Sequence, residues 1–264
     1  MTMRSDDGGQ SRRGSAAGGE TGEERPAGSP GPEAVPPEAP AAAAELFGSR
    51  LPLAERYAAL LADAGVQRGL IGPREVDRIW TRHILNCAVV EELVPHGAHV
   101  VDIGSGAGLP GIVLAIARPD LTVTLLEPLL RRTVFLNECL ELLGLDRVVV
   151  ERGRAEEFAA RLRADVVTAR AVAPLDRLAR WALPLLKPDG RLLALKGERA
   201  ADELETARRE FPALRSCQAE VVPVGHGMVD PATTVVQVIA TGSAVSRETA
   251  RRSAGATKQR GRKR

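Results

Sequence analysis

The segment from Val100 to Gly111 constrains this chain most, because four glycines fall within eight residues directly after a short apolar run. The run predicts a buried strand, and the glycines predict a loop that turns sharply and comes close to a ligand. Pro110 suits the first turn of a following helix, where a missing N–H costs nothing. A strand, a tight loop and a helix N-terminus together predict a cradle for a nucleotide-type cofactor.

Two cofactors fit this cradle, and Asp102 distinguishes them. Gly106–Gly111 matches the G-x-G-x-x-G pattern of dinucleotide-binding proteins, but a carboxylate at the mouth of the loop would repel a pyrophosphate. S-adenosylmethionine has no phosphate, and its sulfonium and ammonium groups favour the same carboxylate. Glu127, which ends the next apolar run, is expected to accept from the ribose hydroxyls of either cofactor. The segment therefore favours a methyltransferase, and a nicotinamide-dependent dehydrogenase is the alternative.

The composition divides the chain into three regions. Residues 1–44 contain no Leu, Ile, Phe, Trp or Tyr and are predicted to be disordered. Residues 45–240, with a net charge of −2, are predicted to form one folded domain that begins with helices at 46–94. Residues 241–264 carry eight basic side chains and one acidic side chain, which predicts a disordered basic tail. The tail is either a solubilising segment or a phosphate-binding one, in which case the candidate residues are Lys258, Arg260, Arg262, Lys263 and Arg264.

The three cysteines are widely spaced and odd in number, so the sequence indicates neither a disulfide framework nor a metal site. The first residues contain no apolar core of a signal peptide, and no apolar stretch approaches the ~18 residues of a membrane span. We therefore expect a cytoplasmic protein that does not associate with membranes.

The alternation of apolar runs and amphipathic segments predicts an α/β fold with a mostly parallel sheet and helices on both faces. Helices are expected at Leu46–Ala64 and from Pro73 to Pro95, and Asp189-Gly190 is expected to end a later helix. The last two strands are expected to pair antiparallel at one edge. The predicted strands are Ala98–Ile103, Leu121–Glu127, Arg147–Glu151, Asp165–Arg170, Arg191–Lys196, Cys217–Val224 and Thr233–Ala240.

Four segments in this order resemble one family, the small-subunit (16S) ribosomal RNA methyltransferase G family, also called glucose-inhibited division protein B. They are Arg82–Asn86, Asp102–Gly111, Thr168–Val172 and Ala194–Gly197. The resemblance covers about residues 46–240, and the Arg- and Ala-rich composition is similar to that of actinobacterial members. It implies a class I S-adenosylmethionine-dependent methyltransferase (Rossmann-like) fold. It also implies methylation of N7 of a guanine in the 530-loop region of 16S rRNA, with 16S rRNA or the small-subunit particle as the partner. We expect the protein to be a monomer.

The resemblance also implies a set of cofactor contacts, which by position are Gly104, Leu109, Glu127, Ala155, Glu156 and Arg170. From the residues themselves we add Asp102 and Gly106. All of these lie at or just beyond the carboxyl ends of predicted strands, where open α/β sheets bind ligands. Glu156 suits the exocyclic amine of adenine, and its alternative is an acid that only stabilises the start of a helix.

Arg170 is the candidate catalytic residue. The fourth strand ends without the [DN]-P-P-[YF] sequence of amino-group methyltransferases, and the cysteines lie where no nucleophile is expected. Methylation of guanine N7 needs neither an amino-group motif nor a cysteine nucleophile, because the lone pair of N7 is free. Catalysis therefore reduces to positioning and electrostatics. We expect Arg170 to make a single contact to guanine O6 or to contact a phosphate, since a bidentate grip would cover N7. A surface arginine in an Arg-rich chain is the alternative.

The roles of three further residues remain open at this point. Lys196 is expected to contact RNA from the same rim as Arg170, or else to have a structural role. His83 is interpreted as part of the packed core, and Asn86 stands where the family commonly has Asp.

A function outside the enzymes is the last alternative. The chain would then be a catalytically idle RNA-binding assembly factor.

Overall fold

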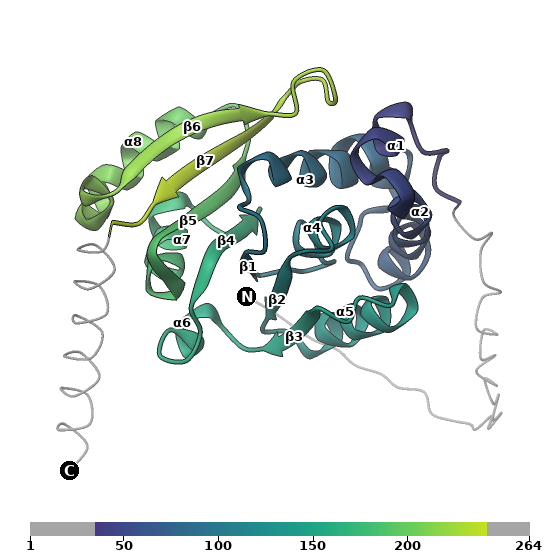
Figure 1. Cartoon of the computed structure of the whole chain (residues 1–264), viewed down its shortest axis with the longest axis horizontal. Coiled ribbons are helices and arrows are strands. Elements are labelled where there is room, and N and C mark those ends of the chain that lie inside the picture. The colour runs from purple at the N-terminus through teal and green to yellow at the C-terminus, as the bar shows by residue number, and fades with distance from the viewer. Residues whose placement is uncertain (1–34, 242–264) are drawn as a thin grey trace, which may run out of the picture. The chain divides into compact units, whose positions relative to one another are not determined.

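The computed structural model describes residues 35–241, and everything below concerns this part of the chain. Its centre is a seven-stranded sheet with the order β3-β2-β1-β4-β5-β7-β6 (Figure 1). The five neighbours from β3 to β5 pair in parallel, and β7 pairs antiparallel with both β5 and β6. The strands are β1 (His99–Ile103), β2 (Thr122–Glu127), β3 (Val148–Arg152), β4 (Ala164–Arg170), β5 (Leu186–Lys196), β6 (Gln218–Val224) and β7 (Thr233–Ile239). The predicted mostly parallel sheet with an antiparallel edge pair is confirmed.

Helices cover both faces of the sheet (Figure 1), and each face has its own hydrophobic cluster. The N-terminal helices, α4 and α5 cover one face, and α6, α7 and α8 cover the other. Val100 and Val101, adjacent on β1, are fully buried in the two different clusters, as expected for a central parallel strand. The helices are α1 (Ala41–Phe47), α2 (Leu51–Leu60), α3 (Leu85–Ala88), α4 (Gly111–Ala117), α5 (Leu130–Leu143), α6 (Ala155–Phe158), α7 (Leu175–Ala182) and α8 (Ala200–Glu210). No described helix is long and apolar enough to cross a membrane.

The folded part begins earlier than predicted. Helix α1 starts at Ala41, Ala43 is fully buried, and Trp80 Nε1 donates a hydrogen bond to the carbonyl of Pro37 at 2.9 Å. The predicted boundary at residue 44 is therefore wrong, because small alanines that carry little hydrophobic signal still fit closely against neighbouring helices. Residues 1–34 and 242–264, which include Lys258, Arg260, Arg262, Lys263 and Arg264 of the predicted basic tail, lie outside the described residues.

The predicted helix from Pro73 to Pro95 is present as consecutive 3₁₀, π and α segments and not as one regular α-helix. A 3₁₀ segment at Pro73–Arg78 leads into a π segment at Ile79–Ile84, then α3, then a second 3₁₀ segment at Val89–Leu93. The π segment places Ile79, Trp80, His83 and Ile84 all on the buried side. Wide turns of this kind are frequent at functional sites.

The Asp189-Gly190 pair, which is predicted to end a helix, lies within a strand. Asp189 has φ = 62° and lies within β5, where the register with β4 shifts between Ala164 and Val166. A Cβ atom on Gly190 would lie 2.9 Å from the carbonyl oxygen of Lys187, so the close backbone approach at this irregularity requires glycine. The Asp189-Gly190 pair is thus a bulge and not the end of a helix.

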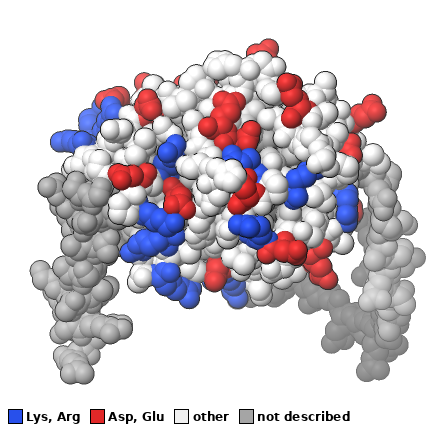
Figure 2. Space-filling model, viewed as in Figure 1, with Lys and Arg blue, Asp and Glu red and all other residues white. Residues whose placement is uncertain are grey.

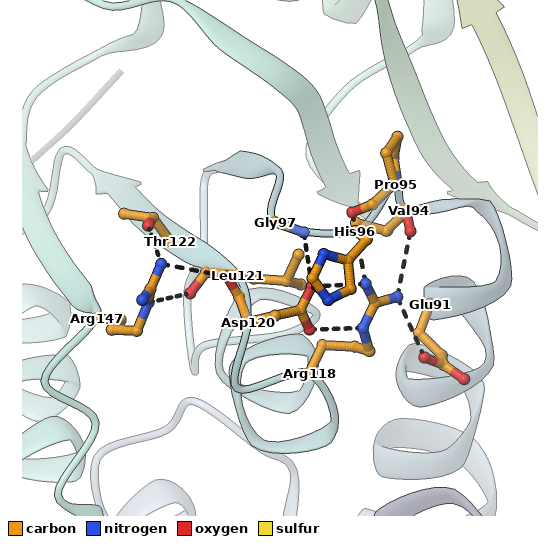
Figure 3. A network of polar contacts seen from close by, with 10 residues as sticks. All are labelled: Glu91, Val94, Pro95, His96, Gly97, Arg118, Asp120, Leu121, Thr122 and Arg147. Atoms are coloured by element: carbon orange, nitrogen blue, oxygen red, sulfur yellow. Dashed lines mark hydrogen bonds and ion pairs between the residues drawn. The ribbon is translucent and has the colours of Figure 1, made fainter.

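The amino ends of the strands are closed by a polar network around Arg118 (Figure 3). Arg118 donates to both carboxylate oxygens of Asp120 at 2.8 Å and to the carbonyl of Val94 at 3.2 Å, and it lies 3.5 Å from Glu91. The hydrogen bonds from Arg118, with that from the backbone N–H of Gly97, hold the pKa of the Asp120 carboxyl well below its usual range. The network joins the end of α4 to the loop before β1, at the amino ends of the strands, whereas the glycine loop lies at their carboxyl ends.

We expect Asp120→Asn to lower the free energy of unfolding by about 1–2 kcal/mol at neutral pH, because the amide has no negative charge and offers Arg118 one acceptor oxygen instead of two. A depressed pKa means that the carboxylate stabilises the fold fully above about pH 4 and loses this effect as the pH falls further. Urea unfolding should therefore show a smaller difference between wild type and variant at pH 3 than at pH 5. Asp146→Asn, at an exposed carboxylate with no partner among the described residues, is the control. An equal difference at both pH values would contradict the assignment.

Candidate active site

Two adjoining cavities open at the carboxyl ends of β1, β2 and β4. The larger has a volume of about 490 Å³ and the smaller about 270 Å³, and both are lined by Gly104, Pro128 and Val172. The larger cavity also contains Gly106, Leu109, Glu127 and Arg170, and the smaller contains Ala155 and Glu156. All predicted cofactor-binding residues except Asp102 therefore line one continuous site.

The glycine loop has the geometry that its sequence requires. Gly104 lies at φ = +66° and Gly106 at φ = +58°, in the left-handed region that side chains disfavour. The backbone N–H of Gly104 donates to the carbonyl of Leu126 at 2.8 Å, which ties the loop to the end of β2. A Cβ atom on Gly104 would lie 3.0 Å from the side chain of Val172, in the wall shared by the two cavities.

Glu127 ends β2 beneath this loop, with only 1% of its surface exposed. Its Oε2 accepts from the backbone N–H of Gly106 at 3.0 Å, and its Oε1 accepts from that of Leu129 at 2.9 Å. Each carboxylate oxygen has a second lone pair, so both can still accept from a ligand. A carboxylate held in this way at a cavity wall suits the two adjacent hydroxyls of a ribose.

Asp102 does not have the predicted position. It is fully buried and is not among the residues that line either cavity. Its Oδ1 accepts from Thr168 Oγ1 at 2.9 Å, and its Oδ2 accepts from the backbone N–H of Gly111 at 3.2 Å. Burial raises the pKa of this carboxyl to about 7 in spite of these hydrogen bonds. The predicted direct contact between the Asp102 carboxylate and the cofactor is therefore corrected: the side chain joins β1, β4 and the first residue of α4 under the loop.

The residues that line the smaller cavity have the chemistry of a site for an aromatic group. Leu126, Pro128 and Trp181 give it mainly apolar walls, and Glu156 at its rim is exposed. This arrangement suits an adenine whose ring is desolvated and whose amine meets a carboxylate. The two cavities together thus fit the two ends of an adenosine cofactor.

Arg170, at the end of β4, is held by the N-terminal helical segment. Its Nη2 lies 2.5 Å from His83 Nδ1, and its Nη1 lies 3.2 Å from Cys87 Sγ and 3.4 Å from the carbonyl of His83. Burial raises the pKa of the Cys87 thiol, against the effect of Arg170. A buried protonated thiol that binds an arginine is not an activated nucleophile, which agrees with the prediction that catalysis does not use cysteine.

Sequence reasoning misses or misinterprets three residues at the site. His83 is buried, as predicted, yet it lines the larger cavity and contacts Arg170. Glu75 contacts His83 Nε2 at 3.1 Å, and the hydroxyl of buried Tyr57 donates to the carbonyl of Ala107 in the glycine loop at 2.7 Å. Helical spacing correctly marks His83 as inward-facing, but spacing alone cannot show which buried polar atoms meet.

Lys196 and Asn86 have structural contacts. Lys196 Nζ donates to Glu203 Oε1 at 2.7 Å and to the carbonyl of Ala173 at 2.9 Å, with 13% of the side chain exposed. Its ammonium is thus engaged at the end of β5, which favours the structural alternative over the predicted RNA contact. Asn86 Oδ1 accepts from Thr233 Oγ1 at 3.2 Å, a contact that an amide makes without any charge.

Comparison with known proteins identifies the family. Residues 50–229 match the model of a family described as rRNA small subunit methyltransferase G (GidB). The chain belongs to this family. It is 67% identical over 228 residues to the ribosomal RNA small subunit methyltransferase G of Thermobifida fusca (strain YX), covering 84% of this chain and 96% of that one. It is 62% identical over 203 residues to the protein of the same name in Streptomyces avermitilis, covering 76% and 85% of the two chains.

Family membership and geometry together decide the cofactor. As a member of the methyltransferase G family, the chain has a class I methyltransferase fold and is an enzyme that uses S-adenosylmethionine. The sheet agrees, since its order departs from the dinucleotide-binding order 3-2-1-4-5-6 by placing an antiparallel strand between β5 and β6. Glu127, the apolar smaller cavity and the space kept open at Gly104 fit this cofactor without a phosphate site. The dehydrogenase and the catalytically idle factor are therefore no longer alternatives.

Proposed function

We propose that this methyltransferase G family member methylates N7 of a guanine in the 530-loop region of 16S rRNA, presented as free rRNA or as the small-subunit particle. The relatives' names supply the small-subunit rRNA as substrate class, and Arg170 at the cavity supports the choice of atom. We also propose that the protein is cytoplasmic and monomeric.

The chemistry of N7 matches what the site offers. S-adenosylmethionine supplies a methyl group that is already activated as a sulfonium. Guanine N7 has a free lone pair, so no side chain needs to remove a proton, and the site needs only to hold and orient the base. Two features fit this demand: β4 ends Thr168-Ala-Arg170, without an amino-group motif, and Cys87, whose thiol contacts Arg170, is buried.

The contacts of Arg170 limit what it can do to a base. Nη1 faces His83 O and Cys87 Sγ, and Nη2 faces His83 Nδ1, so at most two of the five N–H groups of a guanidinium stay available. This number suffices for a contact to guanine O6 or to a phosphate oxygen. We infer that Arg170 orients the guanine from the O6 side and leaves N7 open to the methyl group.

Arginines around the cavity offer a docking surface for RNA. At the carboxyl ends of the strands and on the 3₁₀ segment next to His83, exposed arginines have no side-chain partner among the described residues; they are Arg74, Arg78, Arg131, Arg154, Arg177 and Arg199. At the opposite edge Arg118 binds Asp120, and Lys187 binds Asp165. Figure 2 shows acidic and basic groups interspersed over one face of the molecule, as expected for a folded domain with a small net charge. Basic groups left unpaired around the site are what a polyanionic substrate requires.

The decisive experiment locates the methyl group. Small-subunit particles and free 16S rRNA from cells without this gene are incubated with the enzyme and labelled S-adenosylmethionine. Borohydride reduction and aniline cleavage should then cut the RNA at one guanine in the 530-loop region. A matched fragment with 7-deazaguanine at that position should accept no label. Label on another base or on another atom of guanine would overturn the proposal.

Removing residues 242–264 tests the predicted basic tail separately. We expect unchanged affinity for S-adenosylhomocysteine, weaker RNA binding and a shallower salt dependence. The log–log slope should fall by about 0.7 for each phosphate that the shortened protein no longer neutralises on single-stranded RNA. The choice of guanine should not change, since phosphate contacts position an RNA but do not read its bases. Equal affinity and equal slopes in fluorescence anisotropy for both lengths would assign RNA docking to the arginines of the folded domain.

A further inference from the structure

His83 is placed between two charged residues from different parts of the chain. Arg170 Nη2, from the end of β4, lies 2.5 Å from the imidazole Nδ1. Glu75 Oε2, from the 3₁₀ segment at Pro73–Arg78, lies 3.1 Å from Nε2 on the other side of the ring. His83 is only 7% exposed and lines the larger cavity. The three side chains therefore form one connected row that ends at the proposed catalytic group.

The donors and acceptors in this row fix one tautomer. A guanidinium can only donate, so His83 Nδ1 must accept and carries no proton. Nε2 then carries the proton and donates to the Glu75 carboxylate, which also forms an ion pair with Arg82, whose Nε lies 3.2 Å from Oε2. The carboxylate thus holds the ring in the orientation that presents Nδ1 to Arg170.

The surroundings keep this ring neutral. Burial and the positive charge of Arg170 lower the pKa of His83 to about 4, against the opposite effect of Glu75, while Arg82 adds a smaller lowering effect. Within residues 35–241, the charged groups around the ring are Arg170 from β4, Glu75 from the 3₁₀ segment and Arg82 from the π segment, which pairs with Glu75. At neutral pH the imidazole is therefore an acceptor and not a second cation beside Arg170.

We propose that His83 is a positioning residue that orients the Arg170 guanidinium toward the cavity, and that Glu75 fixes the imidazole for this purpose. This inference rests on the role of Arg170 given under the proposed function. A long side chain at the end of a strand can adopt many rotamers, and a fixed acceptor at Nη2 selects one of them. The N-terminal helical segment would then complete the active site as well as cover the sheet.

The first test is a double-mutant cycle with His83→Gln and Arg170→Ala. Glutamine keeps a polar group near the Nε2 position for Glu75 but places no acceptor where Nδ1 lies. We expect His83→Gln to lower turnover on rRNA about 10- to 100-fold, as for a misplaced catalytic group. In the Arg170→Ala background the same change should have almost no further effect. His96→Gln, at a side chain that is 90% exposed, is the control.

Glu75 offers a test by conservative replacement. Glu75→Gln keeps an acceptor for His83 Nε2–H and should retain most of the turnover, whereas Glu75→Ala removes the acceptor and should lose several-fold more. A role in packing alone predicts the same result for both variants when their unfolding midpoints are equal. Equal turnover of the two variants would count against a role for Glu75 in orienting the ring.

Nitrogen-15 NMR of the histidine rings tests the contact without any measurement of activity. At pH 7, His83 should show an unprotonated Nδ1 and a protonated Nε2. Its pKa should rise in Arg170→Ala, because the neighbouring cation is gone. An unchanged pKa, a protonated Nδ1 or additive losses in the cycle would overturn the proposal. Normal turnover of Arg170→Ala would instead overturn the proposed role of Arg170, so the two failures are distinguishable.

Discussion

Arg170→Ala should lower methyl transfer to rRNA by about 10²- to 10³-fold, the scale seen when one preorganised donor is removed from an active site. Its guanidinium is a charged hydrogen-bond donor at the cavity and is held by contacts to His83 and Cys87. Single-turnover measurements at saturating S-adenosylmethionine would isolate the loss in the transfer step. Arg209→Ala, at a residue of α8 whose guanidinium contacts the Thr206 hydroxyl on the same helix, is the control and should leave turnover unchanged.

Arg170→Lys tests whether the charge alone is sufficient. A lysine ammonium is compact and cannot meet His83 Nδ1, the Cys87 thiol and a ligand in one plane, so we expect a loss close to that of alanine. Calorimetric titration with S-adenosylhomocysteine separates weaker cofactor binding from slower transfer. Full turnover of the lysine variant would reduce Arg170 to a non-specific positive charge.

The sequence predicts the location of the site well because the strands of a parallel sheet end at one edge. Glu127 and Arg170 each end an apolar run, and the register of β2, β1 and β4 brings those ends together. The glycine loop is predictable for the same reason, since Gly104 and Gly106 lie at positive φ, which only glycine adopts readily. These features depend on local pattern and on a topology with few alternatives.

The wrong predictions concern which polar atoms meet after the chain folds. The sequence predicts Asp102 at the mouth of the loop, but Thr168 from β4 and Gly111 from α4 bind its carboxylate under the loop. For Lys196 the sequence leaves an RNA contact and a structural role open, and Glu203, seven residues later, binds its ammonium, which favours the structural role. The position at a strand end predicts at which end of the sheet a side chain lies. It does not predict which groups of other elements bind that side chain.

Gly104→Val should weaken the binding of S-adenosylhomocysteine by about 100-fold, which corresponds to about 2.7 kcal/mol. Two effects combine at this position. The left-handed φ of +66° is unfavourable for a side chain, and a Cβ atom would lie 3.0 Å from Val172 in the wall between the cavities. Gly104→Ala, with one carbon added, should lose about tenfold in affinity by calorimetry.

Gly144→Ala separates these two effects. Gly144 ends α5 at φ = +62°, close to the φ of Gly104, but nothing lies within 4 Å of the Cβ position. Both alanine variants should therefore lose about 1–2 kcal/mol of stability from left-handed strain. Only Gly104→Ala should also lose cofactor affinity, because only there does the added carbon meet the wall that the cofactor must share. Equal affinities for the two variants would mean that the loop moves aside at no cost, and Gly104 would then matter for folding alone.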